Sequence, residues 1–239
     1  MFFVISFPKS GRTWLGIMLD DLGVWARYSH DGSDHRLRLP LSELRADKAQ
    51  YAGATVLLMV RDPRDTVVSG YFQVTRRLGI PVPSMSDLIR SDWYGIRKIC
   101  HFHLQWFDAA PGMKRFAILR YEQLHVTPGP ALAAVAAFAG IPVNCDMANR
   151  VAENRTFERM RAAEASGELG AKYGTVVRPR NVDDPDSFKM RRGKVGGYND
   201  YFSEADSAYC DAVLTKIDYW PRLWAATARW GLSIPDSTT

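Results

Sequence analysis

The sequence has few cysteines and no long apolar run. Its three cysteines, Cys100, Cys145 and Cys210, are scattered, and no pair has the spacing of metal ligands. This number is too small for a disulfide framework, so we expect reduced, buried thiols. A transmembrane helix needs about 20 apolar residues, and no such run exists. The apolar stretch 1–7 ends at Pro8, too early for a signal peptide, so we expect a cytoplasmic protein.

Internal repeats, low-complexity tracts and a clear linker are also absent from the sequence. The chain has 239 residues, 46% of them apolar, which is enough for a substantial core and short for two domains. We therefore expect a single domain that spans residues 1–239.

Positive charge is in modest excess, with 31 Lys and Arg residues against 26 Asp and Glu residues. Such a balance suits an anionic ligand, a nucleic acid or an anionic membrane. The basic residues lie in separate short motifs rather than in one run interleaved with aromatic residues. This arrangement favours a phosphate-bearing small molecule and argues against a nucleic-acid partner.

Strand-like and helix-like segments alternate along the chain. The continuous apolar run 55–60 is typical of a strand buried on both faces, as in a parallel sheet. The alternation predicts a three-layer α/β sandwich, with helices on both faces of a mostly parallel sheet. Segment 166–190 is polar and aperiodic, and we expect a mobile loop there. Further strands are expected at 2–7, 24–29 and 115–119, and helices at 13–22, 41–50, 63–76, 86–90, 94–109, 130–139, 147–163 and, as the last, 204–217.

A first motif, Pro8-Lys9-Ser10-Gly11-Arg12-Thr13-Trp14, follows the first expected strand. A strand that leads into a small-residue loop and then a helix directs unpaired N–H groups and the positive helix end toward one point. Lys9 adds a positive charge, and Ser10 and Thr13 add hydroxyl donors. The motif lacks the spacing of a Walker A loop. A helix cap with an exposed lysine is the alternative interpretation.

A second motif, Arg61-Asp62-Pro63-Arg64-Asp65-Thr66-Val67-Val68-Ser69, follows the strand expected at 55–60. Arg61 stands at the carboxyl end of that strand, which is where open α/β sheets bind ligands. Ser69 comes about two turns into the next helix. A guanidinium and a hydroxyl from adjoining elements could hold one phosphate. The alternative is a local ion pair between Arg61 and Asp65.

A third motif, Arg191-Arg192-Gly193-Lys194-Val195-Gly196-Gly197, lies near the carboxyl end of the sequence. Clustered cations with glycines can surround a phosphate with backbone and side-chain donors together. A solvated basic loop is the alternative interpretation.

In this order the three motifs resemble those of the sulfotransferase family that uses 3′-phosphoadenosine 5′-phosphosulfate (PAPS). Its members have a PKSGTTW-like loop, then Arg-(Asn/Asp)-Pro-(Lys/Arg)-Asp-x-x-x-Ser, then Arg-Lys-Gly-x-x-Gly. The present sequence departs from the first motif at Arg12, and the three matches span nearly the whole chain. The resemblance implies a P-loop-like fold. It also implies in-line transfer of a sulfuryl group from PAPS to a hydroxyl or amine of a small-molecule, glycan or lipid acceptor, without a metal.

The resemblance also implies roles for single residues. The first loop would bind the 5′-phosphosulfate, with Lys9 stabilising charge on the bridging oxygen, while Arg61, Ser69 and the third motif would bind the 3′-phosphate. The residues expected to hold the phosphates are thus Lys9, Ser10, Gly11, Arg12, Thr13, Arg61, Ser69, Arg191, Arg192 and Gly193.

Four residues are expected to flank the adenine by the same resemblance. Trp14 would stack on the ring, Tyr121 would lie near it, and the pair Thr156-Phe157 matches a Thr-Ser-Phe segment of the family. Trp14 and Phe157 could equally be aromatic residues of the core.

An acceptor hydroxyl attacks sulfur more readily if a base takes its proton, and histidine is the usual choice. In the family a histidine follows the second strand, which makes His30 the candidate here and His35 its rival. Asp31 or Asp34 could orient it. Many relatives have a lysine two residues earlier, whereas this sequence has Tyr28 at that position and lacks the auxiliary charge there.

The sequence does not determine the acceptor. The pocket walls are expected in segments 72–83, 93–106 and 166–189, whose aromatic residues suit a phenol, a sugar ring or a lipid-linked group. His101 and His103 are expected to pack in the second of these. A homodimer is left open.

Two other function classes compete with the transferase. A P-loop kinase of a nucleotide or small metabolite would need the missing Walker A loop. A non-catalytic nucleotide-binding module would not need Lys9 together with a base at His30.

Overall fold

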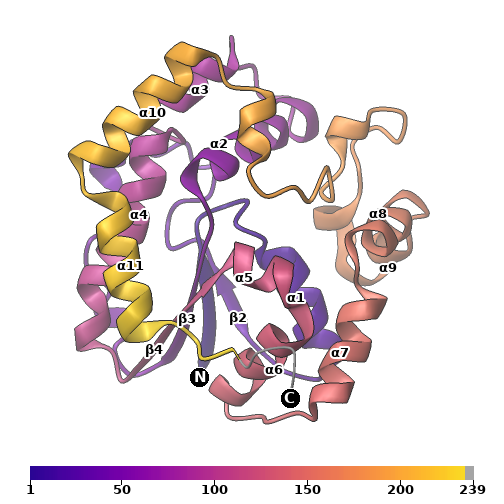
Figure 1. The fold of residues 1–239 in the computed structure, drawn as a ribbon. Coiled ribbons are helices and arrows are strands. Elements are labelled where there is room, and N and C mark those ends of the chain that lie inside the picture. Colours follow the sequence, from indigo (N-terminus) through magenta and orange to yellow (C-terminus); the bar gives the residue numbers. More distant parts are fainter. Residues whose placement is uncertain (235–239) are drawn as a thin grey trace.

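The computed structural model describes residues 1–234. Four parallel strands form one sheet in the order β2-β1-β3-β4, and helices cover both of its faces (Figure 1). This confirms the expected three-layer α/β sandwich with a parallel central sheet. The strands are β1 (Phe2–Ser6), β2 (Arg27–Ser29), β3 (Thr55–Val60) and β4 (Arg115–Arg120).

Strand β3 lies between β1 and β4 and is buried on both faces, which explains its continuously apolar sequence. Leu57 and Met59 pack into the core on one face of the sheet, whereas Val56, Leu58 and Val60 pack into the core on the other. Successive side chains of a strand point to opposite faces, so a strand covered on both sides needs apolar residues throughout.

One face of the sheet is covered by the helices that follow β3 and by the last part of the chain. Their core is aromatic, with Phe7, Tyr94, Phe102 and Trp106 all fully buried. The helices are α2 (Pro63–Phe72), α3 (Met85–Arg90), α4 (Ile96–Ala109), α10 (Glu204–Lys216) and α11 (Tyr219–Trp230), and they lie together in Figure 1.

The opposite face carries a smaller, mainly aliphatic core that includes Leu15, Leu19, Leu132 and Val135. It is formed by α1 (Arg12–Asp21), α5 (Tyr121–Val126), α6 (Pro128–Phe138) and α7 (Cys145–Asn154).

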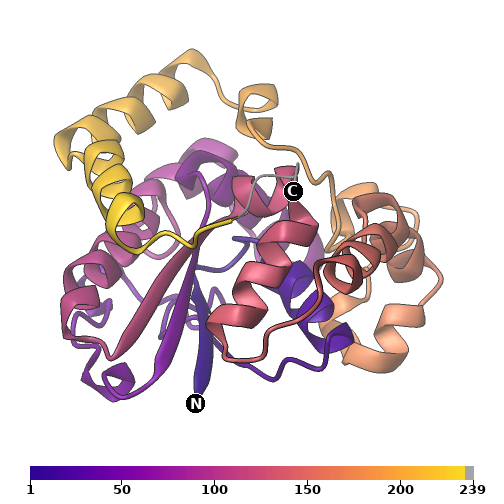
Figure 2. The same cartoon turned by 60° about the horizontal axis from the view of Figure 1, so that its bottom comes forward.

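Helices α8 (Phe157–Ala165) and α9 (Glu168–Tyr173) lie beside the sandwich rather than on the sheet (Figure 2). Arg77, in a π-helical turn (Gln73–Arg77) that continues α2, connects them to the rest of the fold. Its guanidinium lies 3.1 Å from the Glu164 carboxylate in a buried ion pair and donates to the Val176 and Ser187 carbonyls. This ion pair fixes the outer segment to the end of α2.

Several sequence expectations need correction. Segment 41–50 is not a helix but two 3-10 turns (Leu41–Glu43 and Ala49–Tyr51), because the chain turns inward so that Lys48 reaches Asp31 in a buried ion pair of 2.6 Å. The helix expected at 147–163 is broken in two, since Thr156 accepts a hydrogen bond from Arg159 N–H and caps α8. Helix 204–217 is not the last, because α11 follows it.

Segment 166–190 contains more regular structure than a loop, namely α9 and 3-10 turns at Gly174–Val177 and Pro185–Ser187. Its mobility stays a prediction. Cys100 and Cys210 are free and buried as expected, whereas the expectation is wrong for Cys145, which is exposed at the start of α7. Within residues 1–234, no helix is both long and apolar enough to cross a bilayer.

Candidate active site

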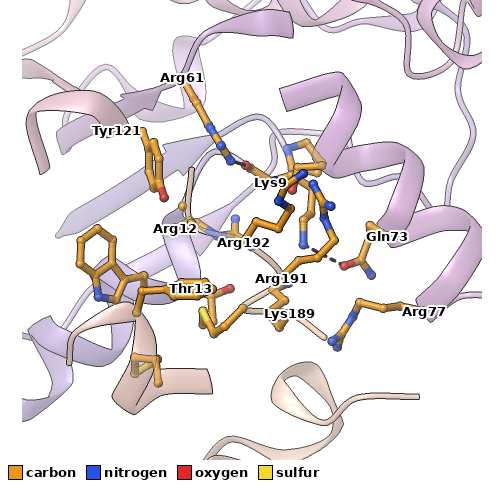
Figure 3. Close-up of a pocket in the computed structure, with 18 of the residues that line it drawn as sticks. Lys9, Arg12, Thr13, Arg61, Gln73, Arg77, Tyr121, Lys189, Arg191 and Arg192 are labelled. Carbon is orange, nitrogen blue, oxygen red and sulfur yellow. Dashed lines mark hydrogen bonds between the residues drawn. The ribbon is translucent and has the colours of Figure 1, made fainter. Parts of the chain in front are cut away.

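A cavity of about 820 Å³ lies at the carboxyl edge of the sheet and brings the three motifs together. Figure 3 shows Lys9 near its centre, with Tyr121 toward one end and Arg77 toward the other. Of the predicted site residues, Ser10 is buried and does not line it. Those that do are Lys9, Gly11, Arg12, Thr13, Trp14, His30, Arg61, Ser69, Tyr121, Thr156, Phe157, Arg191, Arg192 and Gly193.

The loop after β1 has an unusual backbone conformation. Lys9 (φ 73°) and Gly11 (φ 94°) both lie in the left-handed region. A side chain at Gly11 would place its Cβ 2.5 Å from Cδ2 of Tyr121, so only glycine allows the loop to approach α5 this closely. Within residues 1–234, the N–H groups of Gly11, Arg12 and Thr13 find no acceptor. Free N–H groups at the start of a helix form a site for an anion.

Lys9 extends into the cavity, and its Nζ donates to Gln73 Oε1 at 3.1 Å. Burial lowers the pKa of Lys9 well below its usual value, and the nearby cations Lys189 and Arg77 lower it further. Cations held together without enough negative charge would be stabilised by an anion placed among them.

Arg61 connects the first and third motifs at the other end of the cavity. Its guanidinium donates to the Lys9 carbonyl at 3.3 Å and the Lys194 carbonyl at 3.1 Å, and it lies 4.3 Å from the centre of the Tyr121 ring. The predicted pair with Asp65 exists at 3.7 Å. Nε of Arg61 is buried without a partner within the described residues, so the hydrogen-bonding capacity of the guanidinium is not fully used.

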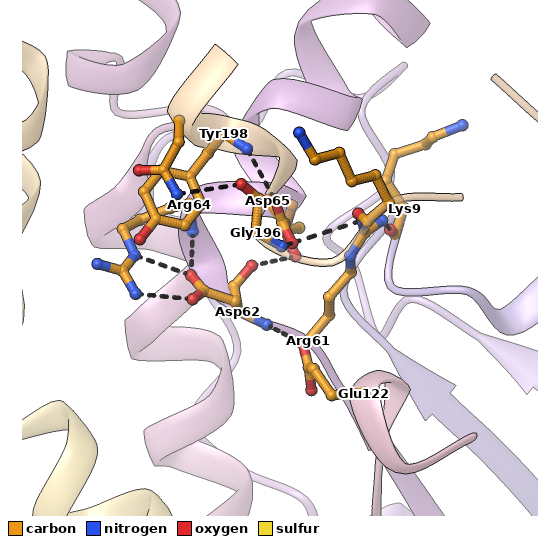
Figure 4. Close-up of polar contacts among 11 residues, drawn as sticks. Lys9, Arg61, Asp62, Arg64, Asp65, Glu122, Gly196 and Tyr198 are labelled. Carbon is orange, nitrogen blue, oxygen red and sulfur yellow. Dashed lines mark hydrogen bonds and ion pairs between the residues drawn. The ribbon is translucent and has the colours of Figure 1, made fainter. Parts of the chain in front are cut away.

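The Asp65 carboxylate fastens the third motif to α2. It accepts hydrogen bonds from the N–H groups of Gly196 at 2.8 Å and Tyr198 at 2.9 Å (Figure 4). Asp65 is buried, so these charge-assisted bonds are strong. Arg64, one residue earlier, points away from the cavity and pairs with Asp62 at 2.8 Å.

The third motif lies over the side chains of two other elements. Arg191 stacks 3.9 Å from the centre of the Phe72 ring and donates to the Tyr201 hydroxyl at 2.7 Å. Gly193 has a positive φ of 61°, and a Cβ there would lie 2.5 Å from the Phe157 ring. Glycine is therefore required for the loop to pack on Phe157. Arg192 also donates to the Tyr201 hydroxyl, at 2.8 Å, and pairs with Asp200 at 2.9 Å.

Aromatic side chains line the end of the cavity away from Arg77. Trp14 and Tyr121 meet edge to face, with ring centres 6.3 Å apart. Trp14 Nε1 donates to the Arg155 carbonyl at 2.7 Å, which holds the indole next to the Thr156-Phe157 segment. These rings form a slot suited to a flat heterocycle.

His30 is held in one tautomer. Its Nδ1 lies 2.8 Å from the Ser6 carbonyl, which can only accept, so Nδ1 carries the proton and Nε2 has the lone pair. Arg12 lies 2.9 Å from Nε2 and donates to it. Burial and the Arg12 charge together lower the pKa of His30 to about 3. The imidazole is therefore neutral, as a general base must be. However, the lone pair on Nε2 already accepts a hydrogen bond from Arg12.

The neighbours of His30 differ from the expectation. Asp31 forms an ion pair with Lys48 at 2.6 Å and does not contact His30. The prediction that Asp31 could orient His30 is therefore wrong. Asp34 and His35 both line the cavity. Burial lowers the pKa of His35 to about 4. Both histidines are thus neutral, and the choice between them stays a prediction.

Gln73, Arg77 and Lys189 also line the cavity, and they lie in segments 72–83 and 166–189, which were expected as its walls. No motif assigned an individual role to any of them. The pKa of Lys189 is lowered to about 8 by burial, Arg77 and Arg12. Conversely, segment 93–106 does not line the cavity, because α4 turns its aromatic residues into the core, where His103 bonds the Tyr219 hydroxyl at 2.8 Å.

The role of Asp65 predicts a loss of stability on substitution. Asp65→Ala should lower the free energy of unfolding by about 1.5–3 kcal/mol, because two backbone N–H groups lose a charged acceptor. Urea unfolding measures this. The control Asp108→Ala removes an exposed carboxylate paired with Arg222 and should change stability by less than about 0.5 kcal/mol. Equal changes in the two variants would contradict the role of Asp65.

The contact between Arg12 and His30 predicts a change in titration. In Arg12→Thr the repelling cation is gone, so the pKa of His30 should rise from about 3 toward its ordinary value, as measured by NMR of the imidazole. Since the folded pKa lies below the unfolded value of about 6.5, His30 stabilises the protein above that pH and loses this contribution as pH falls toward 3. The variant should lose less stability over this range. An unchanged pKa of His30 would exclude the coupling, and Arg150→Ala on α7 is the control.

Comparison with known proteins agrees with this geometry. Residues 39–217 match the family model described as the sulfotransferase domain. Human sulfotransferase 2A1 is 23% identical over 244 residues, which cover 89% of this chain and 82% of that protein. Mouse sulfotransferase SULT7A1 complexed with PAP has a TM-score of 0.67 at 18% identity, covering 95% of this chain and 87% of that one.

Retinol dehydratase in complex with androsterone and the inactive cofactor PAP has a TM-score of 0.65 at 15% identity, covering 90% of this chain and 79% of that one. These structural similarities show that nearly the whole chain shares the fold of these proteins. Since the family model also covers most of the sequence, the chain belongs to the sulfotransferase family.

Proposed function

We propose that this sulfotransferase takes PAPS as its donor and transfers the sulfuryl group to a hydroxyl or amine of an acceptor. The observation that carries this proposal is the single cavity in which unpaired loop N–H groups, Lys9 and Arg61 converge from distant parts of the sequence. Bound PAPS supplies an activated sulfuryl group attached to a phosphate that can leave.

The cavity residues fit a bisphosphorylated adenosine in three places. The N–H groups of residues 11–13 and Lys9 would hold the 5′-phosphosulfate. Arg61, Ser69 and the third motif would hold the 3′-phosphate, with Asp65 keeping that motif in position. The slot between Trp14 and the Thr156-Phe157 segment would take the adenine.

Lys9 would act where charge develops on the oxygen between phosphorus and sulfur. The S–O bond to the donor phosphate breaks as a new bond forms between sulfur and the acceptor atom. His30 Nε2 would receive the acceptor proton, which requires Arg12 to release that atom. Placing charge and base in this way is the usual source of catalysis in phosphoryl-type transfers.

The alternative of a P-loop kinase is less well supported, because the loop after β1 lacks Walker A spacing. We also propose a cytoplasmic location and a donor reaction that needs no metal.

Binding of PAP tests the donor assignment directly. PAP should raise the melting temperature without magnesium, and ATP should not, because Arg61 and the third motif are placed for a 3′-phosphate. Arg61→Ala should weaken PAP binding by about 1.5–3 kcal/mol in calorimetry, the cost of a lost charged hydrogen bond. Arg64→Ala is the matched control, since that side chain points away from the cavity. Equal PAP affinity in the Arg61→Ala variant and the unmodified protein would contradict the assignment.

Lys9 should matter more for turnover than for binding. Lys9→Ala is expected to lower kcat by about 10²–10³-fold, the range for loss of one charge-stabilising donor. PAP affinity should change by less than about tenfold, because the loop N–H groups and Arg61 remain. Turnover measured with labelled PAPS, beside calorimetry with PAP, separates the two effects. Undiminished turnover in this variant would reject the catalytic role.

A further inference from the structure

The cavity has a second wall that the donor residues do not use. It is formed by the segment after β2, by the end of α2 and by the outer segment that Arg77 and Glu164 fix in place. Side chains of this wall include Arg36, Leu78, Val176, Arg178, Arg180 and Lys189.

Four of these side chains are cations without a carboxylate partner in the part of the chain that the structure describes: Arg36, Arg178, Arg180 and Lys189. Arg178 donates only to the Gly170 carbonyl, at 3.4 Å. Unpaired charges of one sign around a concave site attract a ligand of the opposite sign.

Negative charge on the same wall is scarce. Burial raises the pKa of Asp34, but the hydrogen bond from the Arg36 N–H group and the nearby His35 and His30 lower it below its usual value overall. Glu164 is already paired with Arg77 and accepts hydrogen bonds from the N–H groups of residues 189 and 190. Asp34 and Glu158 are therefore the carboxylates of this wall without an ion pair among the described residues, against four such cations.

The cations are distributed from the mouth of the cavity to its centre. Arg36, Arg178 and Arg180 are exposed, whereas Lys189 is partly buried beside Lys9. The Arg180 guanidinium lies close to Gly79, two residues after the π-helical turn that continues α2, since a Cβ there would come within 2.1 Å of Nη1. Figure 3 places Lys189 between Arg191 and Arg77.

The apolar side chains of this wall are Leu78, Val176 and Pro179, with Met160 and Met190 from the outer segment, and none of them is aromatic. The aromatic residues of segment 93–106, which could have received an apolar ring, are in the core instead. An apolar acceptor such as the androsterone bound by retinol dehydratase would remove water from several cations without replacing it.

We infer that the acceptor of this enzyme is a polar molecule carrying a carboxylate or phosphate near its reactive hydroxyl or amine. Arg36, Arg178 and Arg180 bind that anion at the mouth, and Lys189 contacts the acceptor next to the transferred group. This inference rests on the proposed transfer reaction and specifies its substrate class.

Matched acceptor pairs test the inference. The pairs are 4-hydroxyphenylacetate with the neutral 4-hydroxyphenylethanol, and glucose 6-phosphate with glucose, each assayed with labelled PAPS. The anionic member of at least one pair should have the higher kcat/KM, and added salt should reduce that advantage. The first pair reports on a carboxylate and the second on a phosphate.

The double variant Arg178→Ala/Arg180→Ala shows whether these side chains provide the advantage. It should raise KM for the preferred anion by about five- to tenfold, as expected from two partly exposed ion pairs, with the neutral partner little changed. Arg150→Ala removes an exposed cation from outside the cavity and is the control. Equal effects on both members of a pair would overturn the inference.

Calorimetry of the PAP-bound protein gives a result that does not need turnover. Each of the four probes is titrated into the complex, and the anions should bind more tightly than their neutral partners. Equal binding within each pair, or no binding of either anion, would reject an anionic acceptor even if PAP binds. Failure of PAP itself to bind would instead count against the donor assignment.

Discussion

The proposed nucleotide site depends on one carboxylate, Asp65, whose charge is taken up by backbone N–H groups and is not directed at a ligand. Asp65 accepts two backbone N–H groups of a loop 131 and 133 residues further along the chain. Through these bonds α2, which begins directly after the central strand, holds the glycine-rich loop beside the loop after β1. Arg61 then reaches carbonyls of both loops. The second motif therefore has a structural role, because Asp65 and Arg61 hold the two loops in position, in addition to its proposed role in binding.

With the loops held in place, cations accumulate around a space that lacks matching anions. Lys9 and Lys189 have pKa values lowered mainly by burial and further by neighbouring positive charge, and Nη1 of Arg12 is buried without a partner among the described residues. The protein tolerates this repulsion because the parallel sheet and its two cores supply the stability. An anionic ligand would relieve it, so the arrangement prepares the site for binding before any ligand arrives.

Much of this architecture could be predicted from the sequence, because the informative patterns are local. The run 55–60 and the alternation of segments indicated the sheet and its helical layers, and the three motifs with the family resemblance indicated most of the residues that line the cavity. Ser10 was misplaced because a hydroxyl's direction depends on the loop conformation. α11 and the break at Thr156 were missed because distant contacts determine them, and for the same reason the expected wall 166–189 gave no individual role to Lys189. The same holds for Asp31, whose charge is used by Lys48 rather than by His30.

The order of the elements along the chain has a consequence for synthesis on the ribosome. The four strands precede residue 121, so the sheet has been synthesised when about half of the chain has been made. Helices α8 and α9 and the glycine-rich loop follow in the second half, ahead of α10 and α11, and they complete the cavity. A nascent chain could therefore acquire its sheet early and yet remain unable to hold nucleotide until translation is almost finished.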